Sequence, residues 1–505
     1  MKIQKHSPKH NLQKMLSLTL VGSFCITVSN GLLAAEKKSY TRAPFAAFES
    51  QMPDALLGSD KYEKPVWNLH DALNLPKWLS VSVEQRSRYE TMDGRFNASG
   101  RGGDQQIPLQ TDLWLQANLG AFRIGAEFLD ARALGSDIGT GINNTHADQA
   151  DFIQGYMAWA NQNLFYSGIG AEVVAGRQTL NLGSRRLVAR NAMRNTINSF
   201  TGIKLRLLDY DKWQFNGFVT MPVNRYPNTA AELLDETHVF DEEDTHTWFS
   251  GGFLEVYNLG WGINSEVYLY HLDEGDSIYN PTRNRRYFTP GMRFFIKPKK
   301  AQFDFQTETI GQFGTVRATT AANDGRDQDH SAWYQHLDVG YTFNIPWSPR
   351  LGLEYDYASG DHDPNDNKDQ RFDTIYGARR FEFGPTGIYG AFARSNINTP
   401  GVRVTAVPRD DVQLGLSHRF YWLAEDKDGW TTTGIATTML RDRTGKSNNF
   451  IGQQLELTAR WDFNSSLNFE TGWAHLFKGA FAKTTNNAPA KEDVDYFYVQ
   501  SQLRF

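Results

Sequence analysis

The chain has 505 residues, of which 40% are hydrophobic, 13% aromatic and 22% charged, and its formal net charge is −5. A chain this rich in aromatic side chains is not intrinsically disordered, because disordered segments lack the apolar residues that a core requires. The excess of acidic residues argues against a nucleic-acid-binding scaffold. The mean hydropathy of −0.52 argues against a bundle of transmembrane helices. Together these values favour a folded, β-rich protein.

The first 35 residues have the pattern of a secretory signal peptide. Four lysines between positions 2 and 14 precede a short apolar stretch, 15–28, and small residues follow up to Ala35. A basic start, a short apolar run and small residues before a polar sequence are typical of such a signal. The apolar run is too short for a transmembrane helix, which needs about 20 residues. We expect cleavage near Ala35, which removes the only cysteine, Cys25.

From about residue 80 to the end, apolar and polar residues alternate in repeated segments. In 454–461 the even positions are polar and the odd positions apolar, and in 199–208 Lys204 and Arg206 alternate with Ile203 and its apolar neighbours. A period of two residues indicates a strand whose faces meet different environments. We identify about 18 such segments of roughly 9–11 residues, the length with which a tilted strand crosses a bilayer.

The connections between these segments are of two kinds. The turns at 209–212 and 464–466 are short. Long polar insertions lie at 94–107, 135–149, 224–244, 318–329, 360–387, 425–449 and 479–493. Short turns on one rim and long loops on the other are typical of an outer-membrane β-barrel. The sequence therefore predicts an all-β fold: one transmembrane antiparallel barrel of about 18 strands over 36–505, with 36–77 in the periplasm or at the barrel mouth.

A secreted β-sandwich or β-helix would also show alternating strands. Here, however, the apolar faces carry aromatic residues near strand ends, where a bilayer has its interfaces. These candidate girdle residues are Tyr89, Trp159, Trp213, Trp347, Tyr421, Trp422, Trp461 and Trp473. The chain ends on Phe505, with Phe497, Val499 and Leu503 on the same strand face. That ending resembles the signal by which outer-membrane barrels are recognised for insertion, so we prefer a barrel to a soluble fold.

A barrel of this size encloses an aqueous lumen, so function belongs to inward-facing side chains. The run 177–206 contains no acidic residue and seven basic ones: Arg177, Arg185, Arg186, Arg190, Arg194, Lys204 and Arg206. The alternation adds further inward candidates, which are Arg86, Arg88, Arg123, Glu127 and Arg460. Guanidinium groups bind carboxylates through paired hydrogen bonds, and charged rings set anion selectivity in pores. Alternatively, these arginines face carboxylates across the lumen of a general porin and only keep that lumen hydrated.

The sequence lacks the common motifs of enzymatic and metal-binding sites. It has no cysteine pair, no HExxH, no phosphate loop and no dinucleotide fingerprint, so we expect no cofactor, no metal and no enzymatic activity. The run 361–369 begins like a calcium loop, but Asp366 stands where that motif needs Gly and Phe372 where it needs Glu. We interpret the run as a solvated extracellular loop.

Four segments resemble the alginate-export family of outer-membrane porins. They are 176–178, 354–361, 451–457 and 472–479, and the similarity extends in order from about residue 80 to the end. The resemblance implies an 18-stranded monomeric barrel whose electropositive constriction passes a negatively charged uronate polymer. It also implies that Arg177 faces the lumen. The same role carries over less directly to Arg186, Arg190 and Arg194, for which a loop folded into the pore is the alternative to a place on a strand.

The sequence and the resemblance together predict a passive outer-membrane channel for an anionic polysaccharide or oligosaccharide, such as an alginate-like polyuronate. The expected partners are this saccharide, outer-membrane lipid and periplasmic export components, but no nucleic acid. Two alternatives stay open at this point. One is a general diffusion porin for small solutes or nutrients, and the other is a secreted polysaccharide-degrading enzyme.

Overall fold

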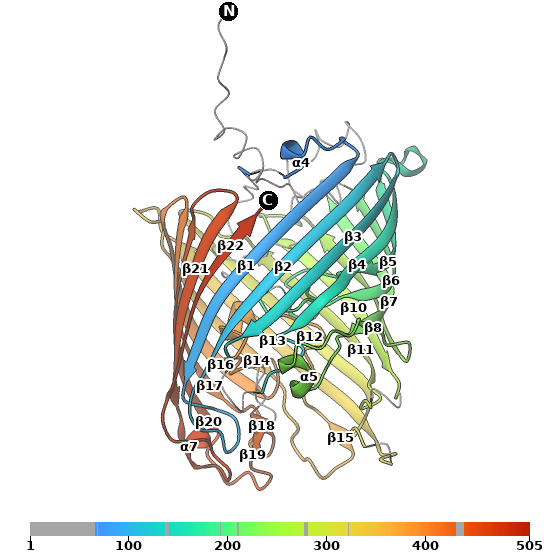
Figure 1. Ribbon diagram of the computed structural model, residues 1–505. Coiled ribbons are helices and arrows are strands. Elements are labelled where there is room, and N and C mark those ends of the chain that lie inside the picture. The colour runs from blue at the N-terminus through green and yellow to red at the C-terminus, as the bar shows by residue number, and fades with distance from the viewer. Residues whose placement is uncertain are drawn as a thin grey trace, which may run out of the picture.

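The computed structural model describes residues 66–67, 69–136, 141–191, 193–209, 212–276, 281–321, 323–430 and 439–505. Within these residues, eighteen long strands form one closed antiparallel barrel (Figure 1). The expected signal peptide, 1–35, and most of 36–77 lie outside the described residues. No helix among the described residues is long and apolar enough to cross a membrane.

The wall strands are 9 to 16 residues long. They are β1 (Leu79–Asp93), β2 (Asp104–Leu119), β3 (Phe122–Leu134), β4 (Asp148–Asn161), β5 (Gly170–Gln178), β6 (Phe200–Asp209), β7 (Trp213–Asn224), β9 (Thr247–Val256), β10 (Asn264–Glu274), β11 (Arg286–Ile296), β12 (Gln302–Arg317), β13 (Asp327–Thr342), β14 (Arg350–Ala358), β16 (Ile397–Arg409), β17 (Val412–Trp422), β20 (Phe450–Asp462), β21 (Leu467–Lys478) and β22 (Val494–Arg504). The connections contain short elements, which are α4 (Leu69–Ala72), η3 (Leu164–Tyr166), α5 (Ala230–Leu234), β8 (Glu242–Glu243), β15 (Lys368–Asp369), α6 (Arg380–Phe383), β18 (Gly429–Trp430), β19 (Leu440–Arg441) and α7 (Ala480–Thr484).

Each wall strand pairs with its neighbours in chain order, and the last strand closes the barrel on the first. The β1–β22 ladder runs from the pair Glu84 and Arg504 to the pair Asp93 and Asp495. Every strand therefore has a partner on both sides. This satisfies the requirement that backbone N–H and C=O groups in hydrocarbon be paired within the protein. The prediction of an all-β, 18-stranded transmembrane barrel is confirmed.

Short and long connections lie at opposite ends of the barrel. The C-terminus and α4 lie at the end with the short turns, and α7, β15 and the β18–β19 hairpin lie at the end with the long loops (Figure 1). The two-residue turn between β2 and β3 is possible because Gly120 adopts a positive φ of 70°, which other residues rarely adopt. Trp67 donates its backbone N–H to Ser466 Oγ at 3.0 Å, so this part of 36–77 lies at the short-turn end.

The strand faces alternate as the sequence predicts. In β20, Leu457 and Trp461 point outward and are 46% and 40% exposed, whereas Gln454 and Glu456 point inward and are buried. In β14, Leu353 is 61% exposed. A soluble protein shows the opposite arrangement, with its apolar side chains inside. The apolar outer face is therefore suited to hydrocarbon and the polar inner face to water.

One of the predicted girdle aromatics faces the other way. Tyr89, Trp347 and Trp461 lie on the outer surface, but Tyr421 is fully buried inside the barrel. Its ring stacks on that of Phe392 with a centroid separation of 3.5 Å. The prediction for Tyr421 is wrong because side chains alternate along a strand, so Tyr421 and its neighbour Trp422 cannot both face lipid.

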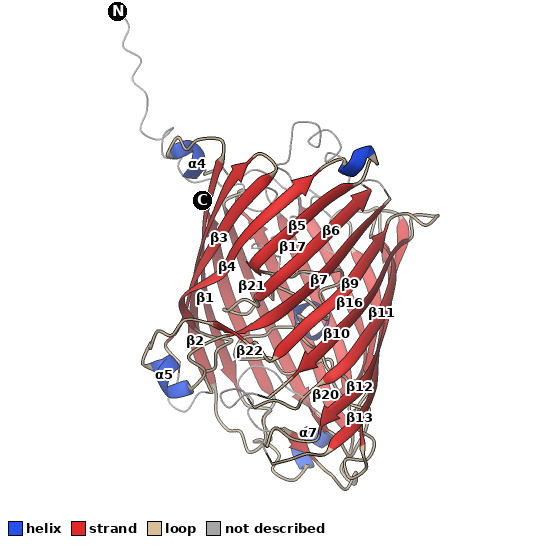
Figure 2. Cartoon of the chain, turned by 90° about the vertical axis from the view of Figure 1, so that its right-hand side faces the viewer, coloured by secondary structure: helices blue, strands red, loops and turns tan. Residues whose placement is uncertain are grey.

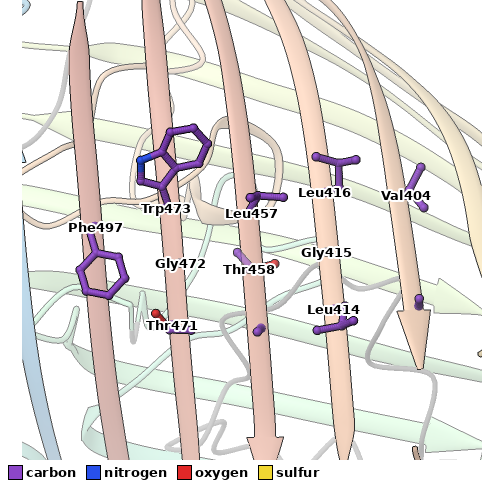
Figure 3. Close-up of a pocket in the computed structure, with 12 residues that line it drawn as sticks. Val404, Leu414, Gly415, Leu416, Leu457, Thr458, Thr471, Gly472, Trp473 and Phe497 are labelled. Carbon is purple, nitrogen blue, oxygen red and sulfur yellow. The ribbon is translucent and has the colours of Figure 1, made fainter. Parts of the chain in front are cut away.

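The outer face also contains an apolar hollow of about 440 Å³ over β16, β17, β20, β21 and β22 (Figure 3). Gly415 and Gly472 lack side chains there, and Leu416, Leu457 and Trp473 surround them. Apart from two threonine side chains its lining is apolar, as expected of a surface that contacts acyl chains.

Candidate functional site

Two long loops fold back into the barrel and meet there. One is 179–199, between β5 and β6, and the other is 370–396, between β14 and β16; we refer to them as the inner-loop pair. Val188 and Tyr376 form a parallel bridge, and the backbone N–H of Ala189 donates to Tyr376 O at 3.2 Å. Segments almost two hundred residues apart in sequence thus lie side by side within the lumen.

A glycine permits this close approach. A Cβ atom at Gly377 would lie 1.7 Å from Arg186 O, a distance that no side chain tolerates. Next to it, the backbone N–H of Ala378 donates to Arg185 O at 2.9 Å. The contact between the two loops therefore depends on the absence of a side chain at position 377.

The first loop is fixed to the wall by a buried arginine. Arg190 Nη1 donates to Glu127 Oε2 of β3 at 2.9 Å, and Arg190 Nη2 lies 3.1 Å from Asp112 Oδ2 of β2. All three residues are buried. Two carboxylates thus compensate this guanidinium, so Arg190 serves to dock the loop and offers little charge to a solute.

Two arginines of β1 hold the same loop through its carbonyl groups. Arg86 Nη2 donates to Arg194 O at 2.7 Å, and Arg88 Nη2 donates to Met193 O at 2.9 Å. Both arginines point inward, as the alternation predicts, and both are buried. Their side chains thus position the backbone next to Arg194.

The second loop is held by the network around α6. Arg186 Nη2 of the first loop lies 2.8 Å from Glu382 Oε1, and Arg186 also pairs with Glu308 of β12. Glu382 in turn accepts from Arg394, while Arg380 Nη1 donates to Glu456 Oε1 of β20 at 2.6 Å. Arg186 is therefore compensated like Arg190, although both belong to a run without acidic residues.

The remaining inward-facing candidates line the wall itself. Arg123 of β3 pairs with Glu172 of β5, and Arg460 Nη2 of β20 lies 2.7 Å from Asp462 Oδ1. Lys204 and Arg206 share the inward face of β6 and are only half-buried. Because β6 runs from the inner-loop region to a short turn, these two cations lie on the short-turn side of the lumen.

Arg177 does not face the lumen. It shares its face of β5 with the exposed Ala175, while Glu172 lies on the inward face. Its Nη2 donates to Glu243 Oε1 at 2.7 Å and to Asp241 O at 3.1 Å, and both partners belong to the loop between β7 and β9. The expectation for Arg177 therefore does not hold: Arg177 and Glu172 are five positions apart on the strand, an odd offset, so the two side chains point to opposite faces.

Two guanidinium groups of the inner-loop pair differ from the others. Arg194 and Arg379 are half-buried, and neither forms an ion pair with a described carboxylate. The Nε atom of each is buried and has no hydrogen-bond partner among the described residues. Arg194 does donate to Asn198 Oδ1, which also accepts from Arg225 Nη1 at 3.2 Å.

Burial and neighbouring cations both act on these two guanidiniums. Burial and the nearby Arg394 lower the pKa of Arg379 to about 10. Burial lowers the pKa of Arg194 as well, and the charges of Arg225 and Arg379 act in the same direction. Asp373 acts in the opposite direction on Arg379, and both guanidiniums stay protonated, as they do in proteins generally. Burial also lowers the pKa of His146 to about 4, with Arg194 contributing, so His146 adds no charge at neutral pH.

Several members of this site were not among the predicted residues. Arg379 and Glu382 lie on the second loop, and Asp112, Glu308 and Glu456 are the carboxylates that the two loops contact. The basic stretch at 379–380 was a sequence signal for the members on the second loop. The wall carboxylates could be assigned to the inward face by alternation, but their partners could not.

A closed barrel with an apolar outer face, a charged lumen and loops folded inward has the architecture of an outer-membrane porin. A family model described as alginate export matches residues 77–494. This match covers most of the chain, and the protein therefore belongs to the alginate export family. A comparison with curated proteins gives no match.

Solved outer-membrane channels share the fold at low sequence identity. OpdQ of Pseudomonas aeruginosa is 12% identical with a TM-score of 0.54, covering 85% of this chain and 97% of that chain. OccAB1 of Acinetobacter baumannii is 12% identical with a TM-score of 0.53 and the same coverage. OccK2 (OpdF) of Pseudomonas aeruginosa, solved in complex with glucuronate, is 10% identical with a TM-score of 0.52, covering 85% and 98%. Family and fold together support an outer-membrane channel.

Proposed function

We propose that this channel passes an anionic saccharide, an alginate-like polyuronate or its oligosaccharides, and that Arg194 and Arg379 attract the carboxylates of this substrate at the inner-loop pair. The observation that carries the proposal is that these two guanidiniums have no described carboxylate partner, whereas Arg186 and Arg190 have two each. A planar guanidinium binds a carboxylate through two parallel hydrogen bonds, and each uronate unit of such a polymer carries one carboxylate.

The other charges of the lumen favour passage of the anionic saccharide over tight binding of it. Lys204 and Arg206 offer a second positive station on the short-turn side, while the carboxylates of Glu382 and Glu456 lie near the inner loops. Conduction requires sites that are favourable enough to enter and weak enough to leave. Carboxylates interspersed among the cations weaken each site for a polyanion. A passive pore has no built-in direction, so the gradient of the saccharide sets it.

The comparisons support an acidic saccharide as the class of substrate. The family is described by alginate export, and the structural neighbour OccK2 was solved with glucuronate, which is an acidic sugar. Both descriptions concern saccharides with a carboxylate. They agree with a cationic constriction in this chain, although the sequence identity to OccK2 is only 10%.

Conductance in planar lipid bilayers tests this proposal. The wild-type channel is expected to prefer chloride to potassium under a salt gradient, and oligouronates are expected to reduce its current. Removing one lumen charge weakens attraction for a monovalent anion by about 0.5–1 kcal/mol at a solvated site, or roughly two- to five-fold in permeability ratio. Arg194→Gln and Arg379→Gln should each lower the anion preference by that factor.

The matched control is Arg409→Gln, because Arg409 lies in an exposed ion pair with Asp411 at the turn between β16 and β17. This variant should retain the selectivity of the wild type. Cation preference in the wild type, or equal selectivity in all three variants and the wild type, contradicts the proposal. So does a current that added oligouronates leave unchanged.

A general diffusion porin is the second candidate. It is favoured by the compensation of Arg186 and Arg190, because a lumen of paired charges stays wet without selecting a sign. Liposome swelling separates the two candidates. Equal permeation of neutral and acidic sugars of the same size supports a general porin, whereas faster entry of the acidic sugar supports the proposed channel.

The cellular setting completes the proposal. The protein is directed to the outer membrane by a signal peptide cleaved near Ala35, and 36–505 forms a single domain that works as a monomer. Short turns then face the periplasm, where export components can contact them. A secreted polysaccharide-degrading enzyme does not suit a closed barrel with an apolar outer face. Mass spectrometry of the mature N-terminus and the mass of the detergent-solubilised protein test the cleavage site and the monomer.

A further inference from the structure

Three aspartates meet beneath the loop between β7 and β9, 225–246. Asp148 and Asp151 belong to β4, and Asp241 lies on the loop. One carboxylate oxygen of each lies within 4.8 Å of the other two, and all three side chains are buried. We refer to them as the aspartate cluster. The same loop carries α5, which projects beyond the barrel wall in Figure 2.

Backbone N–H groups orient two of these carboxylates. The N–H of Asp241 donates to Asp151 Oδ2 at 2.5 Å, which joins the loop to β4. The N–H of Tyr226, at the other end of the loop, donates to Asp241 Oδ1 at 2.8 Å. The positions of both side chains are thus defined by the fold, and each oxygen keeps a second lone pair for another partner.

Asp148 has no such partner. Both of its carboxylate oxygens are buried without any hydrogen bond among the described residues, and the residue is only 1% exposed. An ionised carboxylate in this situation is strongly unfavourable unless a proton or a cation compensates it. This orphaned side chain points to a missing ligand independently of the distance between the aspartates.

The charge balance around the aspartate cluster is compatible with a divalent cation. The aspartate cluster and the adjoining Glu243 supply four carboxylates, while Arg177 and Arg225 supply two guanidiniums. When all four carboxylates are ionised, two negative charges in this group remain uncompensated. Burial, together with the charges of Asp148 and Asp151, raises the pKa of Asp241 to about 8, which is the response expected when carboxylates are crowded without a counter-ion.

We propose that the aspartate cluster binds a divalent metal cation, preferably calcium, and that this ion ties loop 225–246 to β4 at the long-loop end of the barrel. Calcium takes oxygen ligands at about 2.3–2.6 Å, so ligand oxygens on one ion can lie up to about 5 Å apart. The separation within the cluster falls inside this limit. Carboxylates are hard oxygen donors, and such ligands suit calcium and magnesium better than they suit zinc or copper.

Calorimetric titration of the EDTA-treated protein in detergent with calcium chloride tests the proposal. The wild type is expected to show one site with a Kd of about 0.1–1 mM, the range of extracellular calcium modules. Its Tm should rise with calcium concentration, because an ion that binds only the folded state stabilises it. Asp148→Asn should weaken binding at least ten-fold and remove the rise in Tm. A parallel titration with magnesium compares the two ions.

Asp366→Asn is the matched control. It removes one exposed carboxylate from the acidic run 361–369 and should leave calcium binding unchanged. A heat-modifiable shift on gels shows that each variant is a folded barrel, and Asp241→Asn replaces Asp148→Asn if the latter does not fold. The proposal is overturned if the wild type binds no calcium at several millimolar. It is equally overturned if the Asp148 or Asp241 variant binds like the wild type, or if Asp366→Asn abolishes binding.

Discussion

At the scale of single residues, the partner of a charge decides its role more than the charge itself. Arg190 and Arg194 are four positions apart on the same loop. Arg190 contacts two wall carboxylates, whereas Arg194 contacts an amide and carries a lowered pKa. A buried ion pair contributes little net stability once desolvation is counted, but it fixes a geometry. Arg190 therefore positions the loop, whereas Arg194 has no carboxylate partner among the described residues and is the group that we propose attracts an anion.

The sequence could identify these arginines as a group but could not separate them. The run 177–206 has no acidic residue, so nothing local predicts that Asp112 and Glu127 compensate Arg190. The aspartate cluster was missed for the same reason, because Asp241 lies 90 positions from Asp151. Pairings of this kind arise only from the tertiary fold.

A pH dependence follows from the raised pKa of Asp241. The folded protein keeps a proton on this carboxyl up to about pH 8, whereas the unfolded chain releases it near the ordinary value of about 3.8. The stability that this proton provides is fully present below the ordinary pKa and is lost as pH rises through about 8. Without calcium, the Tm of the wild type should therefore fall relative to that of Asp241→Asn over this range.

Other groups near Asp241 set the conditions of this measurement. The charged and titratable groups around Asp241 are the carboxylates of Asp148, Asp151 and the adjoining residues 242–244, the guanidiniums of Arg177 and Arg225, and the side chains of Tyr226 and His238. Both proteins contain all of them, so the difference in Tm isolates residue 241. Saturating calcium should reduce the fall in the wild type, since the ion requires the deprotonated form. Identical pH profiles of Tm in EDTA contradict the prediction.

At the scale of elements, the strands followed from local pattern and the loops did not. Alternation predicted the inward and outward faces of β6 and β20 because a strand side chain has only two directions. The inner loops obey no such period. That 179–199 meets 370–396 depends on the bridge between Val188 and Tyr376, whose residues are remote in sequence. The resemblance, and not the pattern, suggested that the first loop enters the pore.

The contact between the inner loops can be broken by one side chain. Gly377→Val places a Cβ against Arg186 O, and such overpacking costs about 1–3 kcal/mol. The loops should separate, so the single-channel conductance and its noise should increase. The measurement is single-channel recording in planar bilayers.

The control for this variant is Gly325→Ala. Gly325 lies in the connection between β12 and β13, and a Cβ there meets no atom within 4 Å. Its conductance should equal that of the wild type. Wild-type conductance in Gly377→Val would mean that the pairing of the two loops does not restrict the pore.

At the scale of the whole molecule, the distribution of polarity defines the environment of the protein. Leucines such as Leu353 and Leu457 cover the outer face, and the carboxylates and guanidiniums point inward. This inversion was predictable from sequence because it repeats in every strand. The number of strands could be predicted approximately by counting the alternating segments. Closure of the barrel follows from the physical requirement that no strand edge face lipid.

A charged substitution on the outward face of a strand should therefore destabilise the protein more, the closer it lies to the middle of the bilayer. Leu457→Arg introduces a cation in the middle of β20, which is expected to reduce the free energy of unfolding by about 2–4 kcal/mol. Leu119→Arg, at the last residue of β2, should cost only about 0–1 kcal/mol because the side chain reaches the interface. Urea unfolding in lipid vesicles measures both. Equal losses in the two variants contradict a bilayer-spanning wall.

The ladder between β1 and β22 has a consequence for biogenesis. β1 gains its second neighbouring strand only when the eleven-residue β22 has been synthesised and has folded, because β22 is the strand that pairs with β1 on that side. A prematurely terminated polypeptide without this strand would present two unpaired margins, on β1 and β21, where other chains could add. Closure of the barrel thus requires β22, so a truncated polypeptide cannot insert into the membrane as a closed barrel.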